Sequence, residues 1–130
     1  MPQNAFDDCW NIQSRVSALG FDWPDVSGVL DKIAEELEEV REALAKDDVE
    51  HARRELGDLL FACVNLGRFL HIRPEEAVGQ TNRRFENRFS AVENVLRCMN
   101  RTIESCSLEE LDAVWESVKH DADKGLEKRG

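Results

Sequence analysis

Apolar residues recur along almost the whole chain at spacings of three and four, which is the period of an amphipathic α-helix. No stretch alternates between apolar and polar positions for long enough to predict a β-strand. The pattern therefore predicts an all-α fold in which about five helices form an antiparallel bundle. The expected helices cover residues 7–19, 26–46, 48–71, 74 to about 100, and 108 to about 123.

Residues that commonly start and stop helices support these boundaries. Gly20 follows the first helix, and Pro74 stands at the first position of the fourth. Because only residues 46–48 separate the second and third helices, these two should form an antiparallel hairpin. Capping boxes, in which an N-cap side chain and an acid three residues later bond each other's backbone, are expected at Asp47 with Glu50 and at Ser107 with Glu110.

The second and third helices each carry an apolar stripe, and these stripes predict a packed seam between them. The stripe residues are Val26, Val29 or Leu30, Ile33, Leu37, Val40 and Leu44 on the second helix, and Ala52, Leu56, Leu59, Cys63, Leu66 and Leu70 on the third. A chain of 130 residues is long enough for one hydrophobic core. We therefore expect a single helical domain over residues 1–130.

The charge of the chain bears on its partners. It has 27 acidic and 17 basic residues and a formal net charge of -10, which opposes binding to nucleic acid and to anionic membranes. No apolar run approaches the roughly 18 residues that span a bilayer, and the N-terminus, MPQNAFDDCW, lacks the pattern of a secretory signal. We therefore expect a cytoplasmic protein with neither nucleic acid nor membrane as a partner.

Acidic residues gather on the second helix, where such a run is most often a solvated face. Glu36 and Glu39, however, lie three residues apart beside the apolar stripe, as do Glu55 and Asp58 on the third helix. In an antiparallel hairpin centred on residue 47, Glu39 comes level with Glu55, and Glu36 with Asp58. Four carboxylates at one height repel one another, whereas a hard divalent cation supplies the missing charge. The register therefore predicts a magnesium or manganese site.

Gly57 stands between the two acids of the third helix, where a glycine lowers helix stability. Because it has no side chain, we expect it to let a neighbouring helix or a ligand approach between Glu55 and Asp58.

A magnesium ion readily shares its coordination with phosphate oxygens, so a phosphate ester is the implied ligand. The fourth helix offers Arg83, Arg84 and Arg88, of which the last two are one turn apart and able to hold one polyphosphate. A basic surface paired with nearby glutamates is an equally open alternative. Trp115 lies on the apolar stripe of the last helix, where core packing is the commoner role, and Lys119 follows one turn later.

Together these residues resemble the MazG family of all-α nucleoside triphosphate pyrophosphohydrolases. The mark of that family is E-E-x-x-E followed, after a spacer, by E-x-x-D. Here it reads Glu35-Glu36-Leu-Glu-Glu39, then a spacer of fifteen residues, then Glu55-Leu-Gly-Asp58. The resemblance covers about residues 10–120 and is closest to the C-terminal domain of two-domain bacterial MazG proteins. It includes the segments GFDWPDVSGVLDKI, ELGDLLFACVNLGRFL, NRRFENRF and LDAVWESVK.

The resemblance implies metal-dependent cleavage of a nucleoside triphosphate to the monophosphate and pyrophosphate, as house-cleaning of the nucleotide pool. It also implies a helical homodimer in which both chains complete each site, with tetramers as an open alternative. It assigns the attacking water to Glu35 and magnesium, with manganese as a substitute, to Glu36, Glu39, Glu55 and Asp58. It assigns the nucleotide to Lys32, Arg84, Arg88, Trp115 and Lys119.

Two positions depart from the family pattern. Arg84 stands where the family commonly has lysine, and Asn87 stands where a further basic residue is usual. Arginine keeps the charge but presents it as a planar fork, so the phosphate geometry is expected to differ.

Two other functions are alternatives for a chain with this acid motif. One is a narrower relative, such as a dCTP- or dUTP-preferring enzyme or a phosphoribosyl-ATP pyrophosphohydrolase, although the flanking segments favour MazG. The other is a catalytically silent helical dimerisation module, which would need no metal. The intact motif argues against a silent module.

Overall fold

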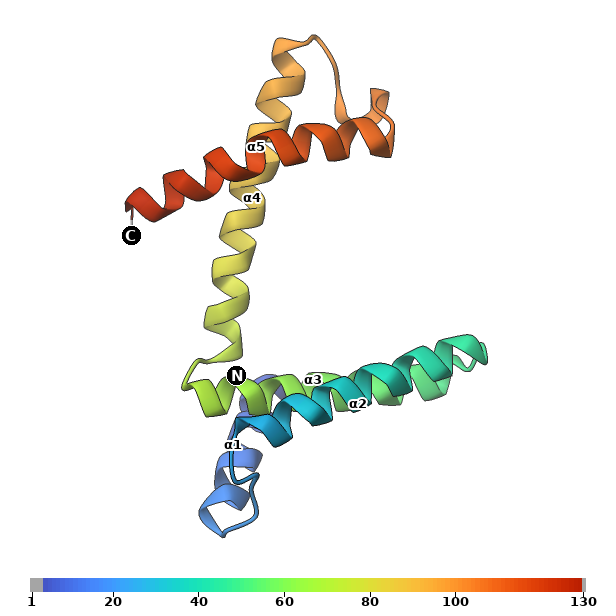
Figure 1. Cartoon of the computed structure of the whole chain (residues 1–130), viewed down its shortest axis with the longest axis vertical. Helices are drawn as coiled ribbons and strands as arrows, with labels where there is room; N and C mark the ends of the chain where they lie inside the picture. Colours follow the sequence, from blue (N-terminus) through green and yellow to red (C-terminus); the bar gives the residue numbers. More distant parts are fainter. Residues whose placement is uncertain (1–3, 130) are drawn as a thin grey trace. The chain divides into compact units, whose positions relative to one another are not determined.

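The computed structural model describes residues 4–129, and their side chains as far as residue 119 (Figure 1). Within this range the chain forms five α-helices and one short 3-10 helix, and it contains no strand. The predicted all-α fold is therefore confirmed. The chain divides into two compact units, of which the first ends at Glu76 and the second starts at Ala77. None of the described helices is both long and apolar enough to cross a membrane.

The first unit opens with α1, Ala5–Ala18. Its N-cap is Asn4, whose side chain accepts a hydrogen bond from the backbone N–H of Asp7, so the helix starts earlier than predicted. Gly20 follows with a φ of 97°, the left-handed conformation that ends many helices and that glycine adopts without strain. The predicted stop at Gly20 is confirmed.

The helices α2, Val26–Ala45, and α3, Val49–Leu70, pack side by side as the predicted hairpin (Figure 1). The N-cap of α3 is Asp48, whose side chain accepts a 3.0 Å hydrogen bond from the backbone N–H of His51. The capping box predicted at Asp47 is wrong by one residue. Asp47 instead occupies the turn with a φ of 53°, a left-handed conformation that aspartate tolerates better than most residues.

The seam between α2 and α3 differs from the predicted stripe. Leu37 and Leu56 leave 44% and 50% of their surface exposed, so they lie beside the seam rather than in it. Ala43 and Ala62 are buried in the seam instead, and these bulkier leucines lie at its side. The residues buried in the hairpin include Val29, Glu36 and Ala43 on α2, and Glu55 and Ala62 on α3.

The second unit takes in most of α4, Pro74–Cys98, followed by the 3-10 helix η1, Ile103–Ser105, and α5, Leu108–Arg129. Pro74 begins α4, and Ser107 and Glu110 bond each other's backbone N–H groups at the start of α5, as predicted. The short η1 was not predicted, and α5 runs further than expected. The core of this unit is formed by Val92, Leu96 and Val118.

Candidate functional site

Three carboxylates meet at one height of the α2–α3 hairpin. Glu36, Glu39 and Glu55 each offer an oxygen, and these oxygens lie within 4.8 Å of one another. Glu36 is 4% exposed and Glu55 is 7% exposed, which is rare for glutamates without a compensating charge. The predicted register therefore brings these three residues together, two of them inside the helix seam rather than beside it.

Repulsion within the cluster is relieved by a shared proton. The neighbouring Glu55 carboxylate, reinforced by burial, raises the pKa of Glu39 to about 7. The pKa of Glu55 is lowered, first by the hydrogen bond that it accepts from Glu39. Protonated Glu39 thus donates to ionised Glu55, and the two behave as one titrating pair. The Nε2 atom of His51, which the sequence analysis missed, lies 3.1 Å from Oε1 of Glu55.

The cluster still has unused ligand capacity. Oε2 of Glu36 and Oε2 of Glu55 are both buried without a hydrogen-bond partner, although a buried acceptor is normally paired. Lys32 supplies one cation, with its Nζ atom 3.0 Å from Oε1 of Glu36. Several carboxylate oxygens close together, with too little positive charge nearby to balance them, suit a hard divalent cation as ligands.

The two remaining acids of the motif lie outside this group of oxygens. Asp58 is exposed on α3 and lines the same pocket as Glu36 and Lys32. Glu35 is exposed on α2, and its Oε1 lies 3.3 Å from Nζ of Lys32. A Cβ at Gly57 would meet open space, so no neighbour among the described residues explains that glycine.

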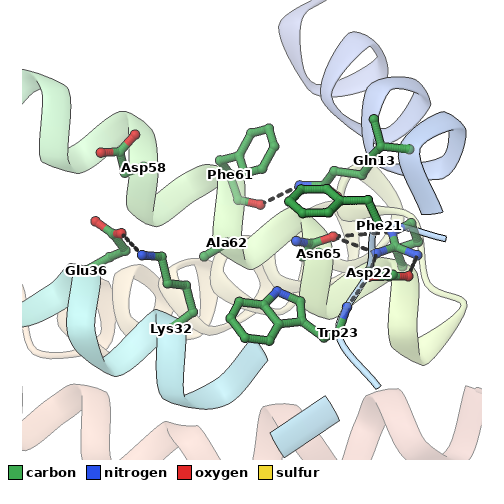
Figure 2. A pocket seen from close by; sticks show the side chains of 12 residues that line it. Gln13, Phe21, Asp22, Trp23, Lys32, Glu36, Asp58, Phe61, Ala62 and Asn65 are labelled. Atoms are coloured by element: carbon green, nitrogen blue, oxygen red, sulfur yellow. Dashed lines mark hydrogen bonds and ion pairs between the residues drawn. The ribbon is translucent and has the colours of Figure 1, made fainter. Parts of the chain in front are cut away.

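A pocket of about 570 Å³ adjoins the cluster, a volume within the range of small-molecule sites. Figure 2 shows Glu36, Lys32 and Asp58 at one end of it, Gln13 and Asn65 at the other, and Phe61 and Trp23 between them. The sequence analysis missed the end of this pocket that holds Gln13. The full lining is Gln13, Val16, Phe21, Asp22, Trp23, Lys32, Glu36, Asp58, Phe61, Ala62, Asn65 and Arg68.

The loop between α1 and α2 is fixed to α3 beside the pocket by a two-pronged ion pair. Both guanidinium Nη atoms of Arg68 bond the carboxylate of Asp22, at 2.8 and 2.7 Å. Arg68 and, to a smaller extent, the Ser17 hydroxyl hold the pKa of Asp22 well below its usual range. The backbone N–H of Trp23 also donates to Asp22, at 2.8 Å, so the indole enters the pocket from a fixed backbone.

The predicted nucleotide ligands Arg84, Arg88, Trp115 and Lys119 all belong to the second unit. The ring of Trp115 packs on the unit's core and lies 5.2 Å from the ring of Phe85, centroid to centroid. The guanidinium of Arg88 lies 5.9 Å from the Trp115 ring, within the range of a cation–π contact. Arg84 and Lys119 are exposed, and Nη2 of Arg84 donates to the Thr81 hydroxyl.

The shared proton gives a prediction for stability. Between about pH 4.5 and 7 the folded state keeps a proton on Glu39 that the unfolded chain releases, so without metal the protein should become less stable as pH rises through this window. A divalent cation should restore stability near pH 8. Thermal unfolding in EDTA at about pH 5 and 8, then with magnesium, measures both effects. Glu39→Gln should flatten the pH response, and an unchanged response in that variant would contradict the shared proton.

Comparisons with known proteins find a family model and several relatives that match this chain. Residues 25–92, just over half of the chain, match the family model described as the MazG nucleotide pyrophosphohydrolase domain. The chain is 43% identical over 108 residues to the nucleoside triphosphate pyrophosphohydrolase/pyrophosphatase MazG of Thermotoga maritima, a match that covers 83% of this chain and 41% of the relative. It is 39% identical over 110 residues to the nucleoside triphosphate pyrophosphohydrolase of Escherichia coli, covering 83% of this chain and 42% of the relative.

A shorter match is found in the uncharacterized protein YabN of Bacillus subtilis, with 42% identity over 67 residues, or 52% of this chain and 14% of that protein. The chain thus spans about two fifths of the length of the Thermotoga and Escherichia relatives.

Proposed function

The chain belongs to the MazG nucleotide pyrophosphohydrolase family, and we propose that it hydrolyses nucleoside triphosphates to monophosphates and pyrophosphate, clearing the cytoplasmic nucleotide pool. The observation that carries this proposal is the cluster of Glu36, Glu39 and Glu55, of which Glu36 and Glu55 are buried, beside a pocket of small-molecule size. The printed names of the Thermotoga and Escherichia relatives state the same activity for those proteins, which supports it here.

The residues that would hold a divalent cation are Glu36, Glu39, Glu55 and Asp58, with magnesium as the proposed ion and manganese as its substitute. The unpartnered buried oxygens of Glu36 and Glu55 fit such an ion, and the exposed Asp58 side chain is free to turn toward it. When bound, the cation polarises phosphate oxygens and offsets their negative charge.

The chain's own residues provide the rest of the chemistry. Lys32 stays protonated because its pKa is raised, first by the hydrogen bond to Glu36, so it is a fixed positive charge for a phosphate oxygen at the charged end of the pocket. Glu35 is exposed beside Lys32 and is placed to orient the attacking water and accept its proton on a carboxylate oxygen. Asp22 and Arg68 hold the loop that carries Trp23, so the pocket wall is rigid before substrate binds.

A homodimer is the proposed active species. Leucines remain exposed at every seventh residue of α2, namely Leu30, Leu37 and Leu44, and Leu56 and Leu70 are exposed on α3. This spacing is typical of helices that pack against another pair of helices. A second copy would cover these leucines. Arg84, Arg88, Trp115 and Lys119 are the residues proposed to bind the nucleotide.

The direct test is pyrophosphate release from a panel of canonical, deoxy and damaged nucleoside triphosphates, with and without magnesium. Broad release that EDTA abolishes is the expected result. Release only from dCTP, dUTP or phosphoribosyl-ATP would identify a narrower enzyme. No release from any nucleotide, with magnesium making no difference to thermal stability, would favour a silent dimerisation module and reject the proposal.

The basic residues of α4 give a second prediction. Arg84→Ala and Arg88→Ala should each lower kcat/KM by about ten- to a hundredfold, because a charge-assisted hydrogen bond to phosphate contributes roughly 1.5 to 3 kcal/mol. Arg83→Ala is the matched control, since its side chain leaves the helix about 100° away from that of Arg84. Steady-state kinetics of the three variants measure the effect. Equal small losses would place all three arginines on a solvated surface.

A further inference from the structure

Gln13 on α1 has 2% of its surface exposed and lies at the end of the pocket away from Lys32 and Asp58 (Figure 2). Its Nε2 atom donates a 2.9 Å hydrogen bond to the backbone carbonyl of Phe61 on α3, as Figure 2 shows. This bond fixes the orientation of the amide, because the opposite orientation would place two acceptor oxygens against each other. Oε1 of Gln13 must therefore face away from Phe61, and it is buried without a hydrogen-bond partner.

An unpaired buried amide oxygen is unfavourable, so its persistence at the wall of a pocket points to a ligand that supplies a donor. Trp23, Phe61 and Ala62 offer apolar surface to the pocket, whereas the charged Asp22 and Arg68 in its lining are paired with each other. The indole of Trp23 lies so close to α2 that a Cβ at Gly28 would come within 2.6 Å of its Cε3 atom. Glycine at that position thus allows the ring to rest against the helix and form a wall of the pocket. Phe61 and Ala62 line the pocket from α3.

The two ends of the pocket differ in the way the two ends of a nucleotide differ. Lys32, Glu36 and Asp58 belong to the charged end, which suits phosphates and a cation, whereas the Gln13 end combines aromatic rings with an amide acceptor (Figure 2). A planar heterocycle packed against Trp23 would place its hydrogen-bonding edge toward Gln13.

We infer that Gln13 is a specificity-determining residue, whose Oε1 accepts a hydrogen bond from an amino or imino N–H on the edge of the nucleobase. The inference rests on the proposed function and deepens it by naming the group that is read. A base without such a donor leaves Oε1 unpaired and binds more weakly. The site therefore accepts bases that carry an N–H on their pairing edge and rejects bases that have lost it.

The test uses pairs of nucleotides that differ only by the amino group. Adenosine is compared with purine riboside, and cytidine with 2-pyrimidinone riboside, each as the α,β-methylene triphosphate that cannot be cut between its first two phosphates. Calorimetric titration of the full chain with magnesium should show about tenfold weaker binding for the member of each pair that lacks the amino group. Equal affinity within both pairs, or no binding of any of the four, would overturn the inference.

Variants of the chain sharpen the test. Gln13→Met keeps a similar volume but removes the acceptor, so it should bring adenosine and purine riboside to the same affinity. Gln80→Met makes the same change at an exposed position of α4 and should keep the preference. If Gln13→Met does not fold, the comparison of analogue pairs on the unaltered chain still decides.

Pyrophosphate release from the natural triphosphates separates this inference from the proposed function. Release without any amino-group preference keeps the proposed function and rejects the role of Gln13. Amino-group preference in binding without release of pyrophosphate from any triphosphate keeps base recognition and rejects the hydrolase.

Discussion

Glu55→Gln should lower the rate of pyrophosphate release by about a thousandfold, which corresponds to about 4 kcal/mol of lost transition-state stabilisation. Glu55 is the central carboxylate of the cluster, because it interacts with Glu36, with Glu39 and with the neighbouring His51. Glutamine has nearly the same shape but no charge, so it removes one proposed cation ligand with little disturbance of the packing around α3. Steady-state kinetics at saturating magnesium provide the measurement.

The fold of this variant should survive, because the substitution also relieves repulsion among buried acids. Circular dichroism should show unchanged helix content, and the melting temperature in EDTA should not fall. Glu38→Gln makes the same change of charge at an exposed position of α2 and should leave the rate almost unaltered. A folded Glu55→Gln protein that keeps its activity would remove the cluster from the mechanism.

The α-helices of the fold were predictable because each depends mainly on local sequence. Amphipathic periodicity, Gly20, Pro74 and the Ser107–Glu110 capping box all act within a few residues of the helix ends they define. The short turn between α2 and α3 then sets the hairpin register, which brings Glu36, Glu39 and Glu55 together. The N-cap of α3 was predicted at Asp47 but is Asp48, because both adjacent aspartates suit a helix cap and the sequence does not distinguish them.

The hydrophobic pattern did not predict which face of α2 packs against which face of α3. Leu37 and Leu56 are the more apolar residues, yet Glu36 and Glu55 take the buried positions. A hydrophobic pattern locates apolar faces but does not say which face meets the partner helix and which meets another molecule. Two buried glutamates in place of two leucines run against the hydrophobic effect, as expected where binding rather than stability determines the residue.

The Gln13 end of the pocket was missed for a different reason. Gln13, Asp22 and Arg68 come from α1, the following loop and the far end of α3, and the sequence carries no spacing that joins them. Asp22 and Arg68 are 46 residues apart, and only the packing of α1 on α3 brings them within bonding distance. The opposite charges of this pair were a signal in the sequence, but many other acidic and basic residues were equally available.

Exposed leucines lead to the prediction of a dimer. Leu37→Asp or Leu56→Asp should convert the protein to a monomer and lower activity by about a hundredfold or more. Each leucine is about half exposed in the single chain, so its replacement leaves the hairpin folded. In the proposed dimer the same leucine side chain would be buried. Replacing it removes roughly 1.5 to 3 kcal/mol of hydrophobic stabilisation of the dimer. The aspartate that replaces it would also be buried without a partner for its charge, which opposes association further.

Light scattering after gel filtration, run over a range of concentrations beside pyrophosphate release, tests both parts of this prediction. Leu19→Asp is the matched control, because Leu19 is 81% exposed and caps α1, so it belongs to neither α2 nor α3. That variant should stay dimeric and active. A fully active monomer, whether of the unaltered chain or of Leu37→Asp, would show that one chain completes the site alone. The apolar face of α2 and α3 would then have no part in catalysis.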